Sequence, residues 1–356
     1  MPDGKVCVAI VTYNSARYIR RCLQAVLAQQ GVALDVIVVD NASTDATPNI
    51  LKEFRGRIRV LENTANVGFA EGQNMAIRAG SSKWVLTLNP DVLVEPGFIA
   101  NLVKTAAADS RAGAVCGRLL SIGPGFEPLP ERLIDSTGIF FTPAMRHFDR
   151  GWHQPDGACF QNVEYVFGAS AAAALFRRRM IEDIAIDGNF FDPDFFVYRE
   201  DADVAWRALL LGWRCIYTPY AVAHHVRTVT PANRRTAPAV VNMHSVKNRF
   251  LMRIKNTTFG VYRRHWFAMT ARDVVVVLAS LVWEPTSLAA FWRLARCLPR
   301  ALRGRRQIMS RRRVSDEVLN RWFSFEAAAP PLDAAAAAAT ESRGVLRAVP
   351  VLSRTT

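Results

Sequence analysis

The chain has 356 residues, of which 50% are hydrophobic, 10% aromatic and 21% charged, a composition that excludes a disordered or a fibrous protein. This length accommodates one catalytic domain with an appendage. The net charge of +14 leaves three classes of anionic partner open, namely nucleic acid, anionic lipid and a phosphorylated substrate. Most of the positive charge lies toward the C-terminus.

The six cysteines form no C-x-x-C pair and have no zinc-binding spacing, which excludes the common zinc and redox motifs. Several lie inside apolar runs, so we expect buried thiols in a reducing compartment. The apolar run at residues 6–11 is followed by polar residues without a small-residue cleavage site. The expected location is therefore the cytoplasm.

Apolar runs and helical spacing alternate along the first 90 residues. Strands are predicted at residues 6–11, 36–39, 58–61 and 84–88, and helices near 19–27, from 41–45 onward and after 66–70. Alternating strands and helices predict a parallel sheet covered on both faces. Ligands of such sheets bind outside the carboxyl ends of the strands.

Polar side chains follow three of these strands and should line one pocket. They are Thr12, Tyr13 and Asn14, then Asp40 and Asn41, then Asn89 and Asp91. Asp40 is placed to accept hydrogen bonds from a nucleotide base or a ribose, although capping of the next helix explains it as well. Gly68 stands where the chain turns tightly or a ligand approaches the backbone.

The segment 86–91 ends an apolar strand with Asn89, Pro90 and Asp91. A carboxylate near a diphosphate suits Mg²⁺ or Mn²⁺, so Asp91 is the candidate metal ligand. An ordinary Asn-Pro-Asp turn is the alternative.

A second acidic group, Glu200, Asp201 and Asp203, precedes an apolar helical segment. The helix dipole alone favours carboxylates there, but one of them is also placed to act as a general base. Farther on, His224 and His225 are candidates to complete the metal site, against the alternative of two structural histidines.

Eight motifs in order carry a resemblance to a known family. They are 11–14 (VTYN), 38–45 (VVDNASTD), 66–70 (NVGFA), 88–91 (LNPD), 168–169 (GA), 196–201 (FVYRED), 206–207 (WR) and 224–225 (HH). Over residues 5–255 the chain resembles glycosyltransferase family 2, and within it the bacterial rhamnosyltransferase-like group.

The resemblance implies an α/β protein of the GT-A fold, with a mostly parallel nucleotide-binding sheet flanked by helices, and an inverting mechanism. It implies that Asp201 is the base, beside Glu200, and that Asp91 holds a divalent metal together with His225 or, one residue away, His224. Asn89 departs from the acidic residue of many members, which removes one charge from the metal site. The donor-binding residues that it implies are Thr12, Tyr13, Asn14, Asp40, Asn41, Gly68, Asn74 and Asn89.

The composition changes beyond residue 230. Residues 245–255 alternate basic and apolar side chains, typical of a helix that lies on a membrane, grips a diphosphate or packs on the domain. Residues 274–283 are uncharged but too few to span a bilayer, so we expect an interfacial placement. Residues 293–313 contain nine arginines and no acid, which favours anionic lipid over nucleic acid because no stacking platform accompanies them.

The expected organisation is a catalytic domain at residues 1–230, a helical, basic, membrane-associating extension at 231–326 and a disordered tail at 327–356. The expected function is transfer of a sugar, L-rhamnose by family likeness, from a nucleotide-diphosphate sugar to a polyprenyl-linked or surface glycan in cell-wall or surface-polysaccharide synthesis. The expected location is the inner face of the plasma membrane.

Two other functions are alternatives to this one. A sugar-nucleotide pyrophosphorylase needs a glycine-rich basic loop after the first strand, where residues 13–17 (YNSAR) stand instead. A non-catalytic scaffold that binds nucleotide sugars or glycans would keep the fold without needing both Asp91 and Asp201.

Overall fold

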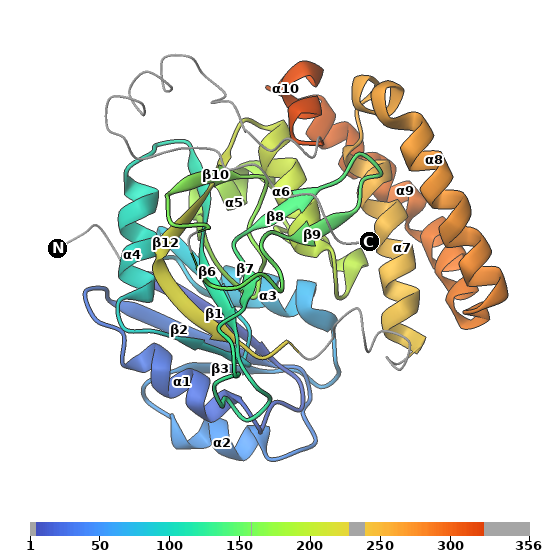
Figure 1. The fold of residues 1–356 in the computed structure, drawn as a ribbon. Helices are drawn as coiled ribbons and strands as arrows, with labels where there is room; N and C mark the ends of the chain where they lie inside the picture. The colour runs from blue at the N-terminus through green and yellow to red at the C-terminus, as the bar shows by residue number, and fades with distance from the viewer. Residues whose placement is uncertain (1–4, 158, 228–238, 324–356) are drawn as a thin grey trace.

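The computed structural model describes residues 5–157, 159–227 and 239–323, so the predicted tail at 327–356 lies outside the described residues. A ten-stranded sheet forms the centre, in the order β10-β12-β6-β11-β4-β1-β2-β3, with β5 paired to β12 and β7 to β6 (Figure 1). Its strands are β1 (Val6–Thr12), β2 (Leu34–Asp40), β3 (Arg59–Glu62), β4 (Trp84–Leu88), β5 (Val92–Val94), β6 (Ala112–Ser121), β7 (Ile134–Ser136), β10 (Glu164–Val166), β11 (Ala173–Arg177) and β12 (Arg214–His225). A separate hairpin pairs β8 (Ile139–Phe141) with β9 (His147–Asp149).

The helices cover both faces and one end of the sheet. They are α1 (Ile19–Leu27), α2 (Thr47–Glu53), α3 (Gly68–Ala79), α4 (Phe98–Ala107), α5 (Arg178–Ile184), the short η1 (Pro193–Phe195), α6 (Glu200–Leu210), α7 (Ala239–Asn256), α8 (Phe259–Val282), the short η3 (Pro285–Leu288), α9 (Ala289–Met309) and α10 (Asp316–Arg321).

The first half of the chain confirms the predicted alternation. Strands β4, β1, β2 and β3 run parallel to one another, whereas β11 is antiparallel to both β4 and β6. The sheet is therefore parallel in the half predicted to bind the nucleotide and mixed in the other half. The second predicted helix start is displaced, because Asp45 Oδ1 first accepts a hydrogen bond from the Thr47 amide at 2.9 Å and α2 begins there.

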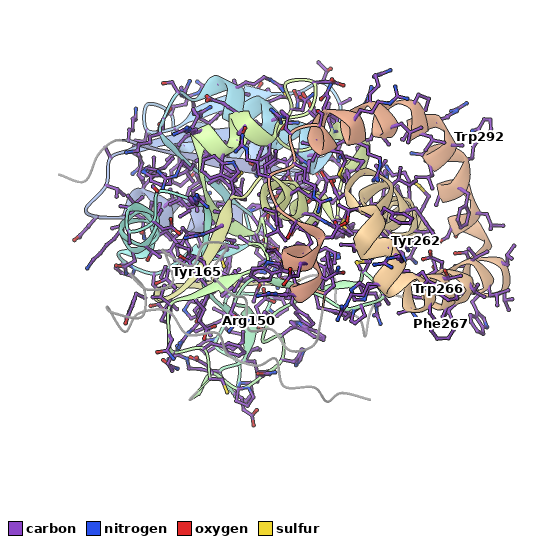
Figure 2. All side chains as sticks on the ribbon, turned by 90° about the horizontal axis from the view of Figure 1, so that it is seen from above. Arg150, Tyr165, Tyr262, Trp266, Phe267 and Trp292 are labelled. Atoms are coloured by element: carbon purple, nitrogen blue, oxygen red, sulfur yellow. The ribbon has the colours of Figure 1, made fainter. Side chains whose placement is uncertain are left out.

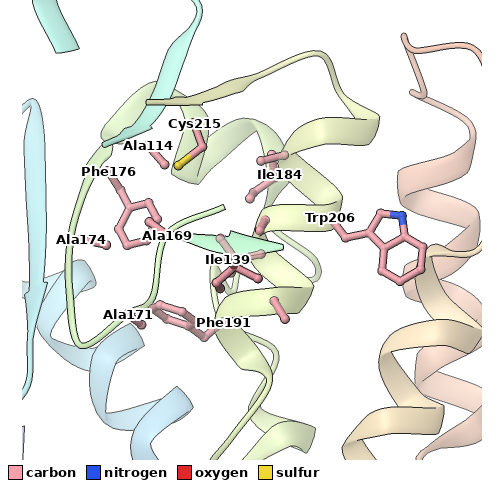
Figure 3. Close-up of a cluster of buried hydrophobic side chains, with 14 of the residues drawn as sticks. Ala114, Ile139, Ala169, Ala171, Ala174, Phe176, Ile184, Phe191, Trp206 and Cys215 are labelled. Carbon is pink, nitrogen blue, oxygen red and sulfur yellow. The ribbon is translucent and has the colours of Figure 1, made fainter. Parts of the chain in front are cut away.

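Alternation along the central strands buries one apolar layer on each face. On β1, Val6, Val8 and Ile10 enter one cluster, whereas Cys7 and Ala9 enter the other. Figure 3 shows part of the second cluster, in which Phe176 and Phe191 lie beside several alanines while Trp206 lies toward the C-terminal helices. Cys7, Cys22, Cys116 and Cys215 are buried as predicted, but Cys159 is exposed.

The C-terminal helices stand side by side against one end of the sheet (Figure 1). Helix α7 packs on α6 and α9, and its buried Lys255 lies 2.6 Å from Asp192 and 3.1 Å from Asp203. The predicted division at residue 230 thus falls ahead of a helix that packs on the catalytic part. In the structure, the alternating basic and apolar residues at 245–255 belong to α7, which packs on the domain.

The uncharged run at residues 274–283 belongs to a longer helix than the sequence pattern indicated. Helix α8 has 24 residues, and only 11% of its most apolar window is buried. By length and composition alone, this helix is long and apolar enough to cross a membrane. The uncharged run is short, as expected, but the helix that contains it continues N-terminally through Arg272 and Asp273, so the length of the run alone does not describe the helix.

Candidate functional site

The carboxyl ends of β1 and β2 place two predicted donor-binding residues together. Thr12 and Asp40 pair across the two strands, and the Thr12 hydroxyl donates to Asp40 Oδ1 at 2.8 Å. Asp40 also accepts from the Ser43 amide at 3.1 Å and its hydroxyl at 2.6 Å. The carboxylate is thereby fixed at the edge of the sheet, where its remaining lone pairs can accept from a ligand.

Asn14 and Tyr13 follow β1 in a loop fastened to the loop after β2. Asn14 has a left-handed backbone with φ of 50°, its amide donates to Ser43 Oγ at 2.9 Å, and its Oδ1 accepts from the Thr44 amide at 2.8 Å. The Tyr13 side chain is half exposed. The loop therefore presents an exposed aromatic ring after the carboxyl end of β1.

Asn41 connects this edge to the start of α3. Its Nδ2 donates to the Gly68 carbonyl at 3.1 Å, and its Oδ1 accepts from Asn63 at 2.8 Å. Gly68 has a φ of +85°, and a Cβ there would meet the Phe196 ring at 2.5 Å. Only glycine fits this position, because the chain must turn there and pass close to the segment before α6.

Asp91 and His225 are brought together by the pairing of β5 with β12. His225 pairs with Val92, and the Val226 amide donates to the Asp91 carbonyl at 3.1 Å. The His225 Nε2 lies 3.5 Å from Asp91 Oδ1, a buried oxygen that accepts no hydrogen bond from any described residue. A carboxylate oxygen and a ring nitrogen thus face each other across a gap.

His224 does not belong to this pair. Successive side chains of a strand point to opposite faces, and the His224 Nε2 lies 2.8 Å from Glu95 Oε1 instead. Of the two histidines, the structure therefore brings only His225 to Asp91 and places His224 beside Glu95.

Two residues that the sequence pattern did not predict, Asp135 and Arg227, contact His225 or each other beside Asp91. Asp135 of β7 lies 2.8 Å from His225 Nδ1 and accepts from Arg227 Nε at 2.6 Å. Burial opposes ionisation of both partners, but His225 and Arg227 lower the pKa of Asp135 to about 2, while Asp135 and Asp91 raise the pKa of His225 to about 10. A carboxylate on the far nitrogen orients the ring, as in many histidine–metal sites. No spacing in the sequence connects β7 with β12, so no motif could have identified Asp135.

The segment before α6 has a constrained backbone. Phe196, Tyr198 and Arg199 all have positive φ, at 64°, 68° and 71°. Asn248 of α7 holds this segment, because its Nδ2 lies 2.9, 2.8 and 2.7 Å from the carbonyls of Phe195, Val197 and Tyr198. Such conformations persist where surrounding contacts over-determine them, commonly at functional sites.

Glu200 and Asp201 follow this segment at the first turn of α6 and differ in protonation. Burial first, and the charge of Asp201 second, raise the pKa of Glu200 to about 8. Burial and the charge of Asp149 raise the pKa of Asp201 to about 6. Near pH 7 the Glu200 carboxyl is mostly protonated and Asp201 mostly ionised.

Asp203 has a structural role. The side chain is fully buried and accepts from Arg207 at 2.8 Å, Asn256 at 2.8 Å and Lys255 at 3.1 Å. With its oxygens occupied by α6 and α7, Asp203 is removed from the candidates for the base.

One loop joins the segment that carries Asp91 to the candidate base, Asp201. The Asn89 amide donates to the Ala172 carbonyl at 2.8 Å, and the Ala171 amide donates to Asp201 Oδ2 at 3.4 Å. Gly168 lets this loop approach α6, since a Cβ there would lie 2.2 Å from the Ala205 Cβ. The two acidic groups, far apart in sequence, therefore lie on either side of a single short loop.

Asn74 is not directed at this edge. Its Nδ2 donates to the Phe191 carbonyl at 2.7 Å and its Oδ1 accepts from the Phe191 amide at 3.0 Å. Both polar atoms of the amide thus hold the chain that leads to α6, which indicates a positioning role.

Asp91 and His225 supply part of the ligand set that a divalent ion needs. Among the described residues no group of three His, Cys, Asp or Glu side chains has metal-ligand geometry. Asp91 Oδ1 and His225 Nε2 supply two donors, which suits an ion that takes its remaining ligands from a diphosphate and water.

Comparisons with known proteins agree with this arrangement. The family model "Glycosyl transferase family 2" matches residues 7–184, half of the chain. The chain is 28% identical over 235 residues to the N-acetylglucosaminyl-diphospho-decaprenol L-rhamnosyltransferase of Mycobacterium tuberculosis, covering 61% of this chain and 75% of that protein. It is 34% identical over 109 residues to the succinoglycan biosynthesis protein ExoO of Rhizobium meliloti, covering 30% of this chain and 31% of that one.

Two solved structures share the fold. GalNAc-T7 with UDP, GalNAc and Mn²⁺ superposes with a TM-score of 0.52 at 11% identity, covering 70% of this chain and 47% of that one. The mannosyltransferase PcManGT of Pyrobaculum calidifontis, with GDP-Man and Mn²⁺, gives 0.50 at 20% identity over 90% and 89% of the two chains. Together with the family match, they identify the chain as a GT-A-fold glycosyltransferase that belongs to glycosyltransferase family 2.

Proposed function

We propose that the protein is an inverting glycosyltransferase in which Asp201 is the catalytic base. The observation that carries this proposal is that the partly buried Asp201 is linked through residues 171–172 to the loop that holds Asn89 and Asp91. An acceptor hydroxyl attacks the anomeric carbon of the donor while the bond to the β-phosphate oxygen breaks. The electron pair leaves with the nucleoside diphosphate, and the hydroxyl proton passes to Asp201.

Asp201 suits this task better than Glu200. A base works best when its pKa lies near or just below the working pH. The pKa of about 6 leaves Asp201 ionised near neutrality, whereas the pKa of about 8 keeps Glu200 protonated.

Asp91 and His225 are proposed to hold a divalent metal, Mg²⁺ or Mn²⁺. A bound ion would stabilise the charge on the departing diphosphate. Since Asp135 and Asp91 raise the pKa of His225 to about 10, metal binding must displace a proton from this ring. Thr12, Tyr13, Asn14, Asp40 and Asn41 are proposed to hold the nucleotide, with Gly68 and Asn89 near the diphosphate.

The donor and acceptor are proposed from the relatives. The Mycobacterium tuberculosis relative is named as an L-rhamnosyltransferase that acts on a diphospho-decaprenol, and the Rhizobium meliloti relative as a succinoglycan biosynthesis protein. We therefore propose a nucleotide-diphosphate L-rhamnose donor and a polyprenyl-linked acceptor in surface-polysaccharide synthesis.

The enzyme is proposed to sit on the cytoplasmic face of the membrane through α8 and α9. Tyr262, Trp266 and Phe267 of α8 and Trp292 of α9 project away from the sheet (Figure 2). Exposed arginines of α9 lie beside them, a combination suited to anionic lipid. The outward apolar surface supports attachment at the membrane.

The test is a panel of nucleotide sugars with purified protein, with and without Mg²⁺ or Mn²⁺, read by mass analysis of the product. We expect metal-dependent transfer from one donor, and a loss of about 10²- to 10⁴-fold in D201N with donor binding unchanged. E200Q is the matched control and should keep most of the activity. Undiminished transfer by D201N would refute the base assignment, and a strong preference for another sugar would refute rhamnose.

A further inference from the structure

The Arg227 guanidinium, two residues beyond His225, bridges two carboxylates from different strands. Its Nε donates to Asp135 Oδ1 at 2.6 Å and its Nη2 donates to Asp135 Oδ2 at 3.2 Å, so the pair has two parallel hydrogen bonds. The same Nη2 also donates to Asp149 Oδ2 at 2.6 Å. Asp135 belongs to β7 and Asp149 to β9. One side chain thus joins the segment after β12 to two other strands.

The two parallel hydrogen bonds fix the plane of the Asp135 carboxylate. A guanidinium is planar and presents its donors in a fixed fork, whereas a lysine ammonium acts as a point charge. Rotation of the Asp135 carboxylate would break both bonds to Arg227. Asp135 is fully buried, so no solvent replaces a lost partner. The position of Asp135 Oδ2 therefore depends on Arg227.

Asp135 Oδ2 is also the atom that holds the ring of His225. It lies 2.8 Å from His225 Nδ1, and the opposite ring nitrogen, Nε2, lies 3.5 Å from Asp91 Oδ1. A carboxylate on one ring nitrogen sets the direction in which the other nitrogen points. A continuous series of contacts therefore runs from Arg227 through Asp135 to the two proposed metal ligands.

Asp149 fastens the guanidinium to the strands beside the candidate base. It pairs with Ile139 across the hairpin of β8 and β9, and the Ile139 amide donates to the Gly168 carbonyl at 2.8 Å. Gly168 lies in the same loop as Ala171, whose amide donates to Asp201 Oδ2 at 3.4 Å. The guanidinium is thus held between the segments that carry the proposed metal ligands and the proposed base.

We propose that Arg227 is a positioning residue that directs the His225 ring toward the metal by fixing the plane of Asp135. Asp91 and His225 are the two protein donors of the proposed metal site, so a misdirected ring would remove one donor of the two. The inference rests on the proposed metal site and deepens it by assigning a role to a residue that does not touch the ion.

The test measures the dissociation constant of Mn²⁺ in the presence of a nucleoside diphosphate, with full-length protein and no sugar. Electron paramagnetic resonance reports the free ion. R227K keeps the charge but loses the fork, and R227Q loses both. We expect Mn²⁺ to bind about tenfold or more weakly to each variant, because outer partners of a metal ligand commonly have effects of this size.

R59Q is the matched control. Arg59 forms the same kind of pair, since its Nε and Nη2 donate to the two oxygens of Asp35 at 3.2 and 2.6 Å. This pair lies at the amino ends of β2 and β3, away from the site at their carboxyl ends. R59Q should therefore bind Mn²⁺ as the wild type does.

A double-mutant cycle separates positioning from general damage. If Arg227 acts through Asp135, R227K should have little further effect on Mn²⁺ affinity in a D135N background. Thermal unfolding of each variant reports any loss of stability. R227K retains a cation beside both carboxylates, so it keeps the test valid if R227Q folds poorly.

The outcomes distinguish this proposal from the proposed function. Wild-type Mn²⁺ affinity in R227K, or effects of R227K and D135N that multiply, overturns the role of Arg227 and leaves the metal site in place. Absence of Mn²⁺ binding by the wild type overturns the metal site and this proposal with it. The D201N transfer assay decides the base assignment independently of either result.

Discussion

At the scale of single residues, the candidate base is set apart from its neighbour by electrostatics. Burial and the negative charge of Asp149 raise the pKa of Asp201. A base must be ionised to accept a proton, so kcat should fall as the pH drops through about 6, the pKa of Asp201. In D149N the repulsion is removed, the pKa of Asp201 decreases, and the acidic limb of the kcat profile should move to lower pH.

The measurement is kcat against pH for wild type and D149N at saturating donor. D109N, which changes the aspartate that precedes β6 and pairs with Arg214, is the control and should leave the limb in place. An acidic limb that stays at the same pH in D149N would contradict the electrostatic account of Asp201.

The sequence predicts residues whose motif is local and misses those that depend on tertiary contact. Asp201 and Asp91 follow from short motifs, and the structure places each beside a site-forming loop. Their chemical roles stay predictions. Asp135 and Asp149 act through Arg227 and His225, from strands that no spacing rule connects. The structural role of Asp203 could not be predicted for the same reason, because its partners Lys255 and Asn256 lie on another helix.

At the scale of elements, α7 holds the segment before α6 through Asn248. Three backbone carbonyls in a segment with positive φ values share one amide group. N248A should release this segment and misplace Asp201, lowering kcat by up to about 100-fold while KM for the donor stays the same.

The control for N248A is N101A, because Asn101 makes the same kind of side-chain contact with a carbonyl, at Tyr220, away from the site. Steady-state kinetics separate kcat from KM, and thermal unfolding reports any general loss of stability. If N248A changed only the melting temperature, Asn248 would be a stabilising residue and not a positioning one.

Element prediction succeeded for uninterrupted strands and failed where a strand was irregular. The predicted strand at 84–88 has the bounds of β4. The apolar residues from Trp213 to Tyr217 predict a short strand, yet β12 continues to His225. Pro219 removes a ladder donor, and the register shifts between Tyr217 and Val222. Sequence patterns at 84–88 had no such interruption.

At the scale of the whole molecule, the exposed apolar side chains are concentrated on α8 and its junction with α9. Val282 and Trp283 are 66% and 77% exposed, and Leu278 is 52% exposed. Replacing Leu278 and Val282 with aspartate should leave the fold intact, because both side chains already face solvent. We expect the double variant to lose most of its binding to vesicles rich in phosphatidylglycerol.

Co-sedimentation with anionic and with neutral vesicles measures this binding. Y220D is the control, because Tyr220 is equally exposed but lies on β12, away from the helices. Alkaline carbonate extraction distinguishes a surface-bound α8 from one that crosses the bilayer. Pelleting of the double variant at the wild-type level would exclude α8 as the attachment surface.

The irregularity in β12 decides which of two adjacent histidines reaches Asp91. Between Tyr217 and Val222 the strand takes five steps while β6 takes two, so it contains three extra residues. An odd insertion reverses the parity of a strand, and every later side chain changes face. If the same residues formed a regular strand, His225 would lie on the face of Tyr217, and His224 would take the place of His225 opposite Asp91. An insertion or deletion of one residue at 218–221 would therefore exchange the two imidazoles while the rest of the sheet stayed in register.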